Sequence, residues 1–131
     1  MNGVNIIEFD EIGRDNRGKT FEIDFRSSSN LILGYREKNS IMGQHFHKGI
    51  EESKKPEQFF LLNGKIKAFF KNRKGEEEES IIIAPCMIQI DPYVYHEFIA
   101  YEDVIFIELK PDHDEYIDNF DENDFIKVIS E

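Results

Sequence analysis

The chain of 131 residues has a single cysteine, Cys86, and no long hydrophobic run. One cysteine excludes an internal disulfide and fits a reducing cytoplasm. The apolar runs, such as residues 59–62 and 81–85, fall far short of the roughly 20 residues that a membrane-spanning helix needs. The first residues carry no basic cluster and lead into a segment at 6–9 that is typical of a strand and not of a signal peptide. We therefore expect a cytoplasmic protein.

Basic side chains are also in deficit, because 27 Asp and Glu stand against 16 Lys and Arg, giving a net charge of −11. The negative electrostatic field of such a charge repels nucleic acid and anionic lipid headgroups, so neither is expected as a main partner. Hydrophobic residues still make up 40% of the chain and aromatic residues 13%, which is enough for a core. The length is typical of one domain, which we expect to span residues 1–131.

The sequence has no internal repeat and no linker rich in Gly, Ser or Pro. Short runs of β-branched and aromatic residues recur instead, with turn residues between them. This pattern is typical of an all-β sandwich or barrel. The predicted strands are 6–9, 20–25, 31–35, 58–62, 66–70, 81–83, 87–90, 97–100 and 104–109.

The strongest turn signal is Asn63-Gly64, which favours the positive φ angles of a type I′ turn. It predicts a hairpin of residues 59–62 and 65–70, with the even-numbered residues of the second strand pointing inward. The acidic run 76–79 is expected to form a solvated hairpin tip.

Helical character is confined to residues 112–131, where apolar residues recur at spacings of three and four among acids. This spacing predicts a short amphipathic piece that packs on the barrel. The alternative is a tail that bridges to another subunit.

The clearest chemical signal is the pair His45 and His47, followed by Glu57 and, after a proline-containing turn, by His96. Residues at i and i+2 of a strand project from the same face, so the first two imidazoles can converge on one point. Three imidazoles and one carboxylate in a dry barrel would bind a divalent transition metal, namely Zn, Fe, Mn or Ni. The alternative is that His45 and His47 are hydrogen-bonded core residues of a metal-free site.

These residues resemble the two motifs of the cupin superfamily, small jelly-roll barrels whose first motif reads G, five residues, HxH, three or four residues, E, six residues, G. Here His45, His47, the Glu57 to Gly64 spacing and His96 match. The resemblance implies an all-β fold, a single antiparallel jelly-roll barrel with a short C-terminal helical segment. Strict counting from the histidines would select Glu51 as the carboxylate ligand. We prefer Glu57, because it leads into the strand that ends at the glycine. His113 lies in a polar turn and is expected to be solvated.

A closer resemblance is to cupins that modify nucleotide-linked sugars. Residues 15–18 read Asp-Asn-Arg-Gly, similar to the DxRG opening of those enzymes, and residues 43–48 are similar to their GxHxHK stretch. Residues 106–120 resemble the last strand and tail of the dTDP-sugar 3,4-ketoisomerases. In those enzymes the resemblance implies a metal-free site, with His45 and His47 as acid and base.

Three departures favour a metal-binding relative instead. Met42 replaces an arginine, and Tyr35 is displaced from the position that counting back from the histidines would give. Glu57 also replaces a residue that is usually glutamine in the ketoisomerases. The cupin domains of some capsular-polysaccharide enzymes share the same opening and histidine stretch and hold a metal. Both comparisons favour a carbohydrate substrate.

We therefore predict an isomerase or epimerase that acts on a keto-sugar or nucleotide-linked sugar in polysaccharide biosynthesis. A metal at His45, His47, Glu57 and His96 would act as a Lewis acid, and Tyr95, Tyr35 or Glu97 would relay the proton. The alternatives are a metal-free ketoisomerase, a metal-dependent dioxygenase and a non-catalytic carbohydrate-binding barrel. The expected substrate-binding cations are Arg17, Arg36 and Lys48, with Arg14 as a further candidate.

A homodimer is also expected, because a short barrel tends to cover its strand edges. The strand at 6–9 would then pair across a two-fold axis.

Overall fold

A computed structural model describes residues 1–26, 30–111 and 115–130. These residues form strands and, near the C-terminus, a short 3-10 turn and one α-helix. None of the helices in the described ranges is long and apolar enough to cross a membrane. The elements are β1 (Val4–Glu8), β2 (Asp10–Asp15), β3 (Gly18–Glu22), β4 (Leu31–Arg36), β5 (Ile41–His45), β6 (Glu57–Asn63), β7 (Lys65–Lys71), β8 (Glu77–Ile83), β9 (Cys86–Ile90), β10 (Tyr95–Ala100), β11 (Val104–Leu109), η1 (Glu115–Asp118) and α1 (Glu122–Ile129).

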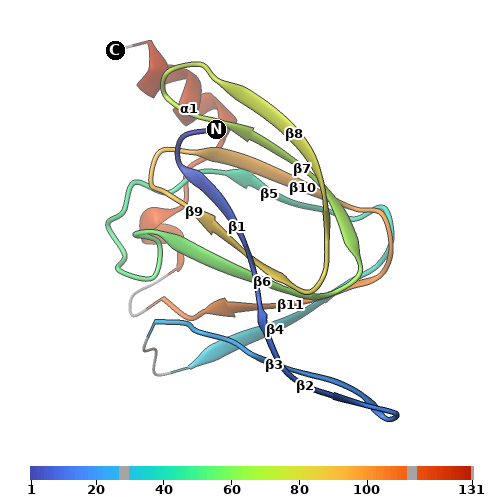
Figure 1. Cartoon of the computed structure of the whole chain (residues 1–131). Helices are drawn as coiled ribbons and strands as arrows, with labels where there is room; N and C mark the ends of the chain where they lie inside the picture. The colour runs from blue at the N-terminus through green and yellow to red at the C-terminus, as the bar shows by residue number, and fades with distance from the viewer. Residues whose placement is uncertain (27–29, 112–114, 131) are drawn as a thin grey trace.

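The strands form two larger antiparallel sheets that face each other (Figure 1). The five-stranded sheet has the order β1-β9-β6-β11-β4, and the four-stranded sheet has the order β5-β10-β7-β8. A separate two-stranded hairpin, β2-β3, extends away from both sheets (Figure 1). This confirms the predicted all-β jelly-roll fold, although the two sheets are open and do not close into one barrel.

The hydrophobic core lies between the two sheets and consists mainly of aromatic and branched side chains. In β7 the even-numbered residues Ile66, Ala68 and Phe70 are fully buried, as predicted. Ring contacts extend this core across the two sheets, with Phe59 of β6 and Phe98 of β10 at a centroid distance of 5.0 Å. This contact sets how closely the two sheets approach beside the site.

The predicted hairpin at Asn63-Gly64 is wrong. Strand β6 pairs with β9 and β11, whereas β7 pairs with β8 and β10, so the turn carries the chain from one sheet to the other. Of the two turn residues, Gly64 has a positive φ, +95°, and Asn63 does not. A Cβ at Gly64 would lie 2.6 Å from the backbone oxygen of Asp103. Close packing against Asp103 therefore explains this glycine better than a type I′ turn does.

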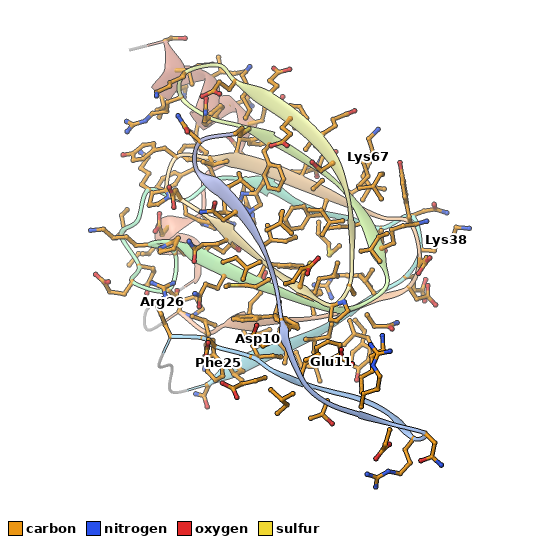
Figure 2. All side chains as sticks on the ribbon, viewed as in Figure 1. Asp10, Glu11, Phe25, Arg26, Lys38 and Lys67 are labelled. Carbon is orange, nitrogen blue, oxygen red and sulfur yellow. The ribbon has the colours of Figure 1, made fainter. Side chains whose placement is uncertain are left out.

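The acidic run does not form a hairpin tip either. Residues Glu77 and Glu79 lie in β8. In the register with β7, Glu77 is the Cα partner of Lys71, and Glu79 faces Phe69 with Lys67 on the diagonal. The Nζ atom of Lys71 lies 3.4 Å from Glu77, and that of Lys67 lies 3.6 Å from Glu79. Lys67 points outward from this sheet (Figure 2). Alternating lysines on the neighbouring strand thus compensate the acids and allow an extended structure.

The helical prediction for the C-terminus is confirmed within the described residues. Asp121 caps α1 through a reciprocal capping box with Asp124. The helix places Phe125 against Phe46 and Tyr95, at ring-centroid distances of 5.2 and 5.8 Å. This cluster lies on the outer side of the four-stranded sheet, so the helix packs on the fold as expected. His113 lies outside the described residues.

The docking of α1 yields a prediction on stability. Phe125 is 2% exposed and Ile126, its neighbour on the same helix, is 51% exposed. We expect Phe125→Ala to lower the free energy of unfolding by about 3–5 kcal/mol, because it leaves a cavity beside Phe46. The matched Ile126→Ala change should cost less than about 0.5 kcal/mol. Urea unfolding measures both, and equal losses would contradict the packing of this helix.

Candidate active site

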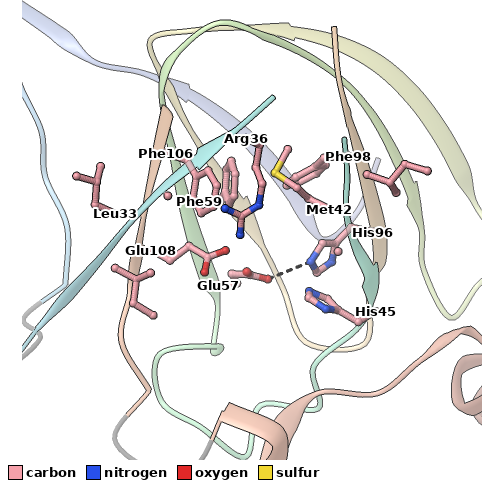
Figure 3. A pocket seen from close by; sticks show the side chains of 14 residues that line it. Leu33, Arg36, Met42, His45, Glu57, Phe59, His96, Phe98, Phe106 and Glu108 are labelled. Carbon is pink, nitrogen blue, oxygen red and sulfur yellow. Dashed lines mark ion pairs between the residues drawn. The ribbon is translucent and has the colours of Figure 1, made fainter. Parts of the chain in front are cut away.

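A cavity of about 440 Å³ opens between the two sheets, beside the core (Figure 3). Its walls combine aromatic and aliphatic side chains with a few ionisable groups. This is the usual composition of a small-molecule site. The lining residues are Ile32, Leu33, Gly34, Arg36, Ile41, Met42, Gly43, His45, Glu57, Phe59, His96, Phe98, Phe106 and Glu108.

The two histidines of the first motif converge, but not as successive residues of one regular strand. Strand β5 ends at His45, and Gly43 and Gln44 have positive φ angles of 83° and 60°. A Cβ at Gly43 would lie 2.9 Å from the backbone oxygen of His96, so only glycine allows β5 to approach β10 this closely. The ring of His45 lies 4.7 Å from those of both His47 and His96.

Glu57, at the start of β6, completes the cluster. Its Oε2 atom lies 3.0 Å from Nε2 of His47 and 3.2 Å from Nε2 of His96. The ligand atoms of His45, His47, Glu57 and His96 all lie within 4.8 Å of one another. Glu51 is not part of this group, so the geometry agrees with the choice of Glu57 made from the sequence.

Backbone carbonyls fix the orientation of two of the rings. Nδ1 of His47 lies 2.5 Å from the carbonyl oxygen of Asp118, and Nδ1 of His96 lies 3.1 Å from that of Val94. A carbonyl only accepts, so each Nδ1 carries the hydrogen and donates it. In the neutral ring, Nε2 is then an acceptor aimed at the carboxylate of Glu57.

The cluster therefore brings acceptors together without a donor between them. Nε2 of His47 and Oε2 of Glu57 are buried and have no hydrogen-bond partner within the described residues. Such an arrangement is stable only when a cation lies between the acceptors, either a metal ion or a proton on a ring. The donor set therefore fits a divalent transition metal.

The charges around the cluster determine the protonation state of Glu57. Burial opposes ionisation of Glu57, but the charges of Lys54, His47 and His96 outweigh it and hold its pKa well below the usual value. Nζ of Lys54 lies 3.5 Å from Oε1, the oxygen that faces away from the histidines. Glu57 is thus ionised, with Lys54 compensating one of its oxygens.

The pKa values of His45 and His47 shift in opposite directions. Burial, followed by the repulsion from His96, lowers the pKa of His45 to about 3. Burial also opposes protonation of His47, but the charge of Glu57 outweighs it and raises the pKa of His47. On the far wall, burial and then the charge of Glu57 raise the pKa of Glu108.

Asp118 holds the segment that follows the histidines. It lies in the tail that resembles the ketoisomerases, but the sequence assigned it no role in the site. It is 1% exposed, and its carboxylate accepts from the backbone N–H groups of Lys48 and Glu51 at 2.6 and 3.0 Å. Together with its carbonyl contact to His47, this fixes the C-terminal segment against the cluster. Asp118 is one of several acids in that tail, and the resemblance does not single it out from the others.

The predicted proton relay is not assembled. In β10, His96 and Phe98 line the cavity, so the alternation of the strand turns Tyr95 and Glu97 to the opposite face. Tyr95 packs against the helix there. Tyr35 is 65% exposed and does not line the cavity.

Of the predicted substrate-binding cations, Arg36 alone lines the cavity. Arg17 is at the end of the β2-β3 hairpin, 2.7 Å from Asp15, and Arg14 pairs with Glu11 on the same hairpin. The amine of Lys48 lies 4.2 Å from the ring centre of Phe120. Within the described part of this chain, these three cations are therefore not placed at the pocket. Sequence reasoning also gave no site role to Lys54 and Glu108, which carry no spacing signal.

No protein-family model and no curated protein sequence matches the chain. Solved structures, in contrast, match over almost its full length. QdtA, a sugar 3,4-ketoisomerase from Thermoanaerobacterium thermosaccharolyticum in complex with TDP, gives a TM-score of 0.78 at 20% identity, covering 99% of this chain and 96% of that one. A histidine-to-asparagine mutant of QdtA, in complex with TDP-4-keto-6-deoxyglucose, gives 0.74 at 20% identity, with 99% and 94% covered.

Two further structures belong to other organisms. A 3,4-ketoisomerase from Helicobacter canadensis gives a TM-score of 0.76 at 17% identity, with 98% of each chain covered. A dTDP-4-dehydrorhamnose 3,5-epimerase from Sulfolobus tokodaii gives 0.66 at 22% identity, with 88% of this chain and 73% of that one covered. These similarities confirm the fold that the resemblance to sugar-nucleotide cupins implied.

The electrostatics of the cluster predict how its histidines titrate in protein that has been treated with a chelator. We expect the imidazole of His45 to stay neutral at pH 5, since its pKa is lowered to about 3, while His47 titrates above its usual value. The unfolded chain protonates His45 below about pH 6.5. This residue therefore destabilises the folded state progressively as the pH falls from there towards 3.

Histidine ring resonances followed by NMR against pH measure both pKa values. A midpoint near 6.5 for His45 would show that its ring is solvated, and the buried cluster described above would then be wrong.

Proposed function

We propose that this protein is an isomerase or epimerase that acts on a nucleotide-linked keto-sugar and holds a divalent transition metal at His45, His47, Glu57 and His96. The observation that carries the proposal is the convergence of unpaired acceptors at the wall of a cavity large enough for a sugar ring. The fold similarity to TDP-sugar ketoisomerases supports the substrate class.

The residues that orient the histidines and those that form the aromatic wall have separate roles in this proposal. Val94 and Asp118 hold the rings of His96 and His47 through their carbonyls, so that Nε2 of each ring points to the common centre. When bound, the ion would supply Lewis-acid polarisation of a substrate oxygen. Phe59 and Phe106, stacked at a ring-centroid distance of 4.8 Å, offer the sugar ring of the substrate an apolar surface and exclude water from that side of the pocket.

Arg36 provides the positive charge of the pocket wall. Its guanidinium lies 5.1 Å above the ring of Phe106, and it donates to the backbone oxygen of Tyr35. No carboxylate pairs with it within the described residues. It can therefore bind the anionic part of a nucleotide-linked sugar.

One specific observation favours a second candidate, the metal-free 3,4-ketoisomerase. Lowering the pKa of His45 and raising that of His47 makes one ring a neutral base and the other an acid near neutral pH. Because His45 lines the cavity, it would take a proton from the carbon beside the carbonyl, and His47 would lie behind it. Both candidates act on the same substrate class.

Replacing His47 by Asn discriminates the two candidates. If the cluster binds metal, His47→Asn should abolish metal binding and turnover of TDP-4-keto-6-deoxyglucose together, because a buried ligand is lost. If the histidines act without metal, the variant should bind the sugar nucleotide normally while kcat falls by roughly 10² to 10⁴, as for a lost acid or base.

Elemental analysis, calorimetric binding of TDP-4-keto-6-deoxyglucose and NMR detection of the isomerised sugar measure the three quantities. Turnover and binding unchanged in the variant would contradict both candidates and leave a non-catalytic barrel. Oxygen consumption by the iron-loaded protein would instead identify a dioxygenase.

The homodimer remains a proposal that the surface of β1 supports. This strand forms the edge of its sheet, and Ile6 and Ile7 are 47% and 40% exposed. Unpaired edges with exposed isoleucines are surfaces that proteins usually cover.

Light scattering should therefore give twice the chain mass of 15.5 kDa at micromolar concentration. Ile6→Glu should shift the protein toward the monomer, whereas Ile126→Glu, on the exposed side of α1, should not. A monomeric wild type would refute the dimer.

A further inference from the structure

Strand β11 carries a carboxyl group on its inward face, where the pattern calls for an apolar residue. Val104 and Phe106 point into the core and are 1% and 4% exposed, and Glu108 is the next residue on that face. Its side chain lines the cavity (Figure 3). Glu108 is half-buried in this partly aromatic wall. A carboxyl there loses hydration and opposes folding unless other groups compensate it, so its presence points to a function.

Burial and then the charge of Glu57 raise the pKa of Glu108, and they outweigh the charges of the described residues Lys54, His96 and His47, which favour its ionised form. Glu57, the other carboxyl of the cavity, lies 3.0–3.5 Å from the side-chain nitrogens of Lys54, His47 and His96. Glu108 makes no hydrogen bond or ion pair with any described residue. Two carboxyl groups thus share the cavity, and of these two only Glu57 lies in direct contact with charged or titratable side chains of the described residues.

The sheet register fixes where the free carboxyl lies. Glu108 is the Cα partner of Phe59, and Glu57 lies two residues from Phe59 on the same face of β6. Figure 3 shows the carboxyl of Glu108 pointing into the pocket, towards the side chains of Arg36 and Glu57. A ring that packs on the aromatic surface of Phe59 would therefore have the metal cluster on one side and Glu108 on the other.

We propose that Glu108 determines substrate specificity by forming a hydrogen bond with a ring hydroxyl of the bound sugar. This inference rests on the proposed function and adds the group that recognises the sugar itself. A carboxyl in either protonation state can bond a hydroxyl. An apolar wall at this position would accept any flat ligand, whereas Glu108 favours one that presents a hydroxyl there.

The test compares the affinities for TDP and for TDP-4-keto-6-deoxyglucose, measured by calorimetry on the full chain. The ratio of the two affinities isolates the contribution of the sugar to binding. A general structural defect would weaken the binding of both ligands and leave the ratio unchanged. In Glu108→Leu the ratio should fall by about 10-fold or more, as expected for one lost hydrogen bond in a buried site. In Glu108→Gln it should stay within about 3-fold of wild type, because the amide still bonds a hydroxyl and cannot titrate.

Glu97→Leu is the matched control, since this glutamate lies on the opposite face of the neighbouring sheet and should leave the ratio unchanged. Thermal melting checks that each variant is folded. An unchanged ratio in Glu108→Leu would overturn the inference, and so would an equal loss in Glu108→Gln, which would show a need for charge. A wild-type protein that binds TDP-4-keto-6-deoxyglucose no better than TDP would refute the proposed function itself.

Discussion

The buried carboxylate of Glu57 is the constraint on which the rest of the site depends. It is 3% exposed, and its two oxygens face different surroundings, Lys54 on one side and the ring nitrogens of His47 and His96 on the other. A buried charge needs a compensating charge nearby, since desolvation is otherwise very costly. Lys54 provides this compensation on one side. On the other side, the Nδ1 hydrogens of the two rings are already donated to backbone carbonyls, so a neutral ring offers Glu57 no second donor. Either a metal ion or a proton on one of the rings must therefore lie there.

Elements far from the cavity hold this arrangement in place. The loop between β5 and β6 delivers both Lys54 and Glu57, and the guanidinium of Arg26 donates to four of its backbone carbonyls, those of Glu52, Ser53, Lys55 and Pro56. Asp118 accepts two of the N–H groups of the same loop and also fixes the ring of His47. The C-terminal segment is therefore part of the site, although none of its described residues lines the cavity.

The sequence predicted the fold class and the four clustered residues, because both are encoded in local spacing. It did not predict the sheet that each strand joins. Asn63-Gly64 is the strongest turn signal, yet β6 and β7 separate into different sheets, since the choice of partner strand depends on contacts such as that with Asp103. Isolated residues such as Lys54 and Glu108 were missed for the same reason. Their importance arises only when the sheets bring distant positions together, and in a chain with 27 acidic residues one more glutamate carries no signal.

The net charge of −11 argues against an anionic ligand only if the charge is spread evenly, and the structure shows that it is not. Two acids of β8, Glu77 and Glu79, are compensated by lysines of β7 on the outer surface. On the β2-β3 hairpin, Arg14 pairs with Glu11 and Arg17 pairs with Asp15. At the cavity, Lys54 offsets Glu57 from behind the wall, and Arg36 lines the cavity with no carboxylate partner among the described residues. A ligand inside this low-dielectric pocket responds to these nearby groups more than to distant surface charges, which solvent screens. The local field at Arg36 is therefore compatible with an anionic nucleotide-sugar despite the acidic composition of the chain.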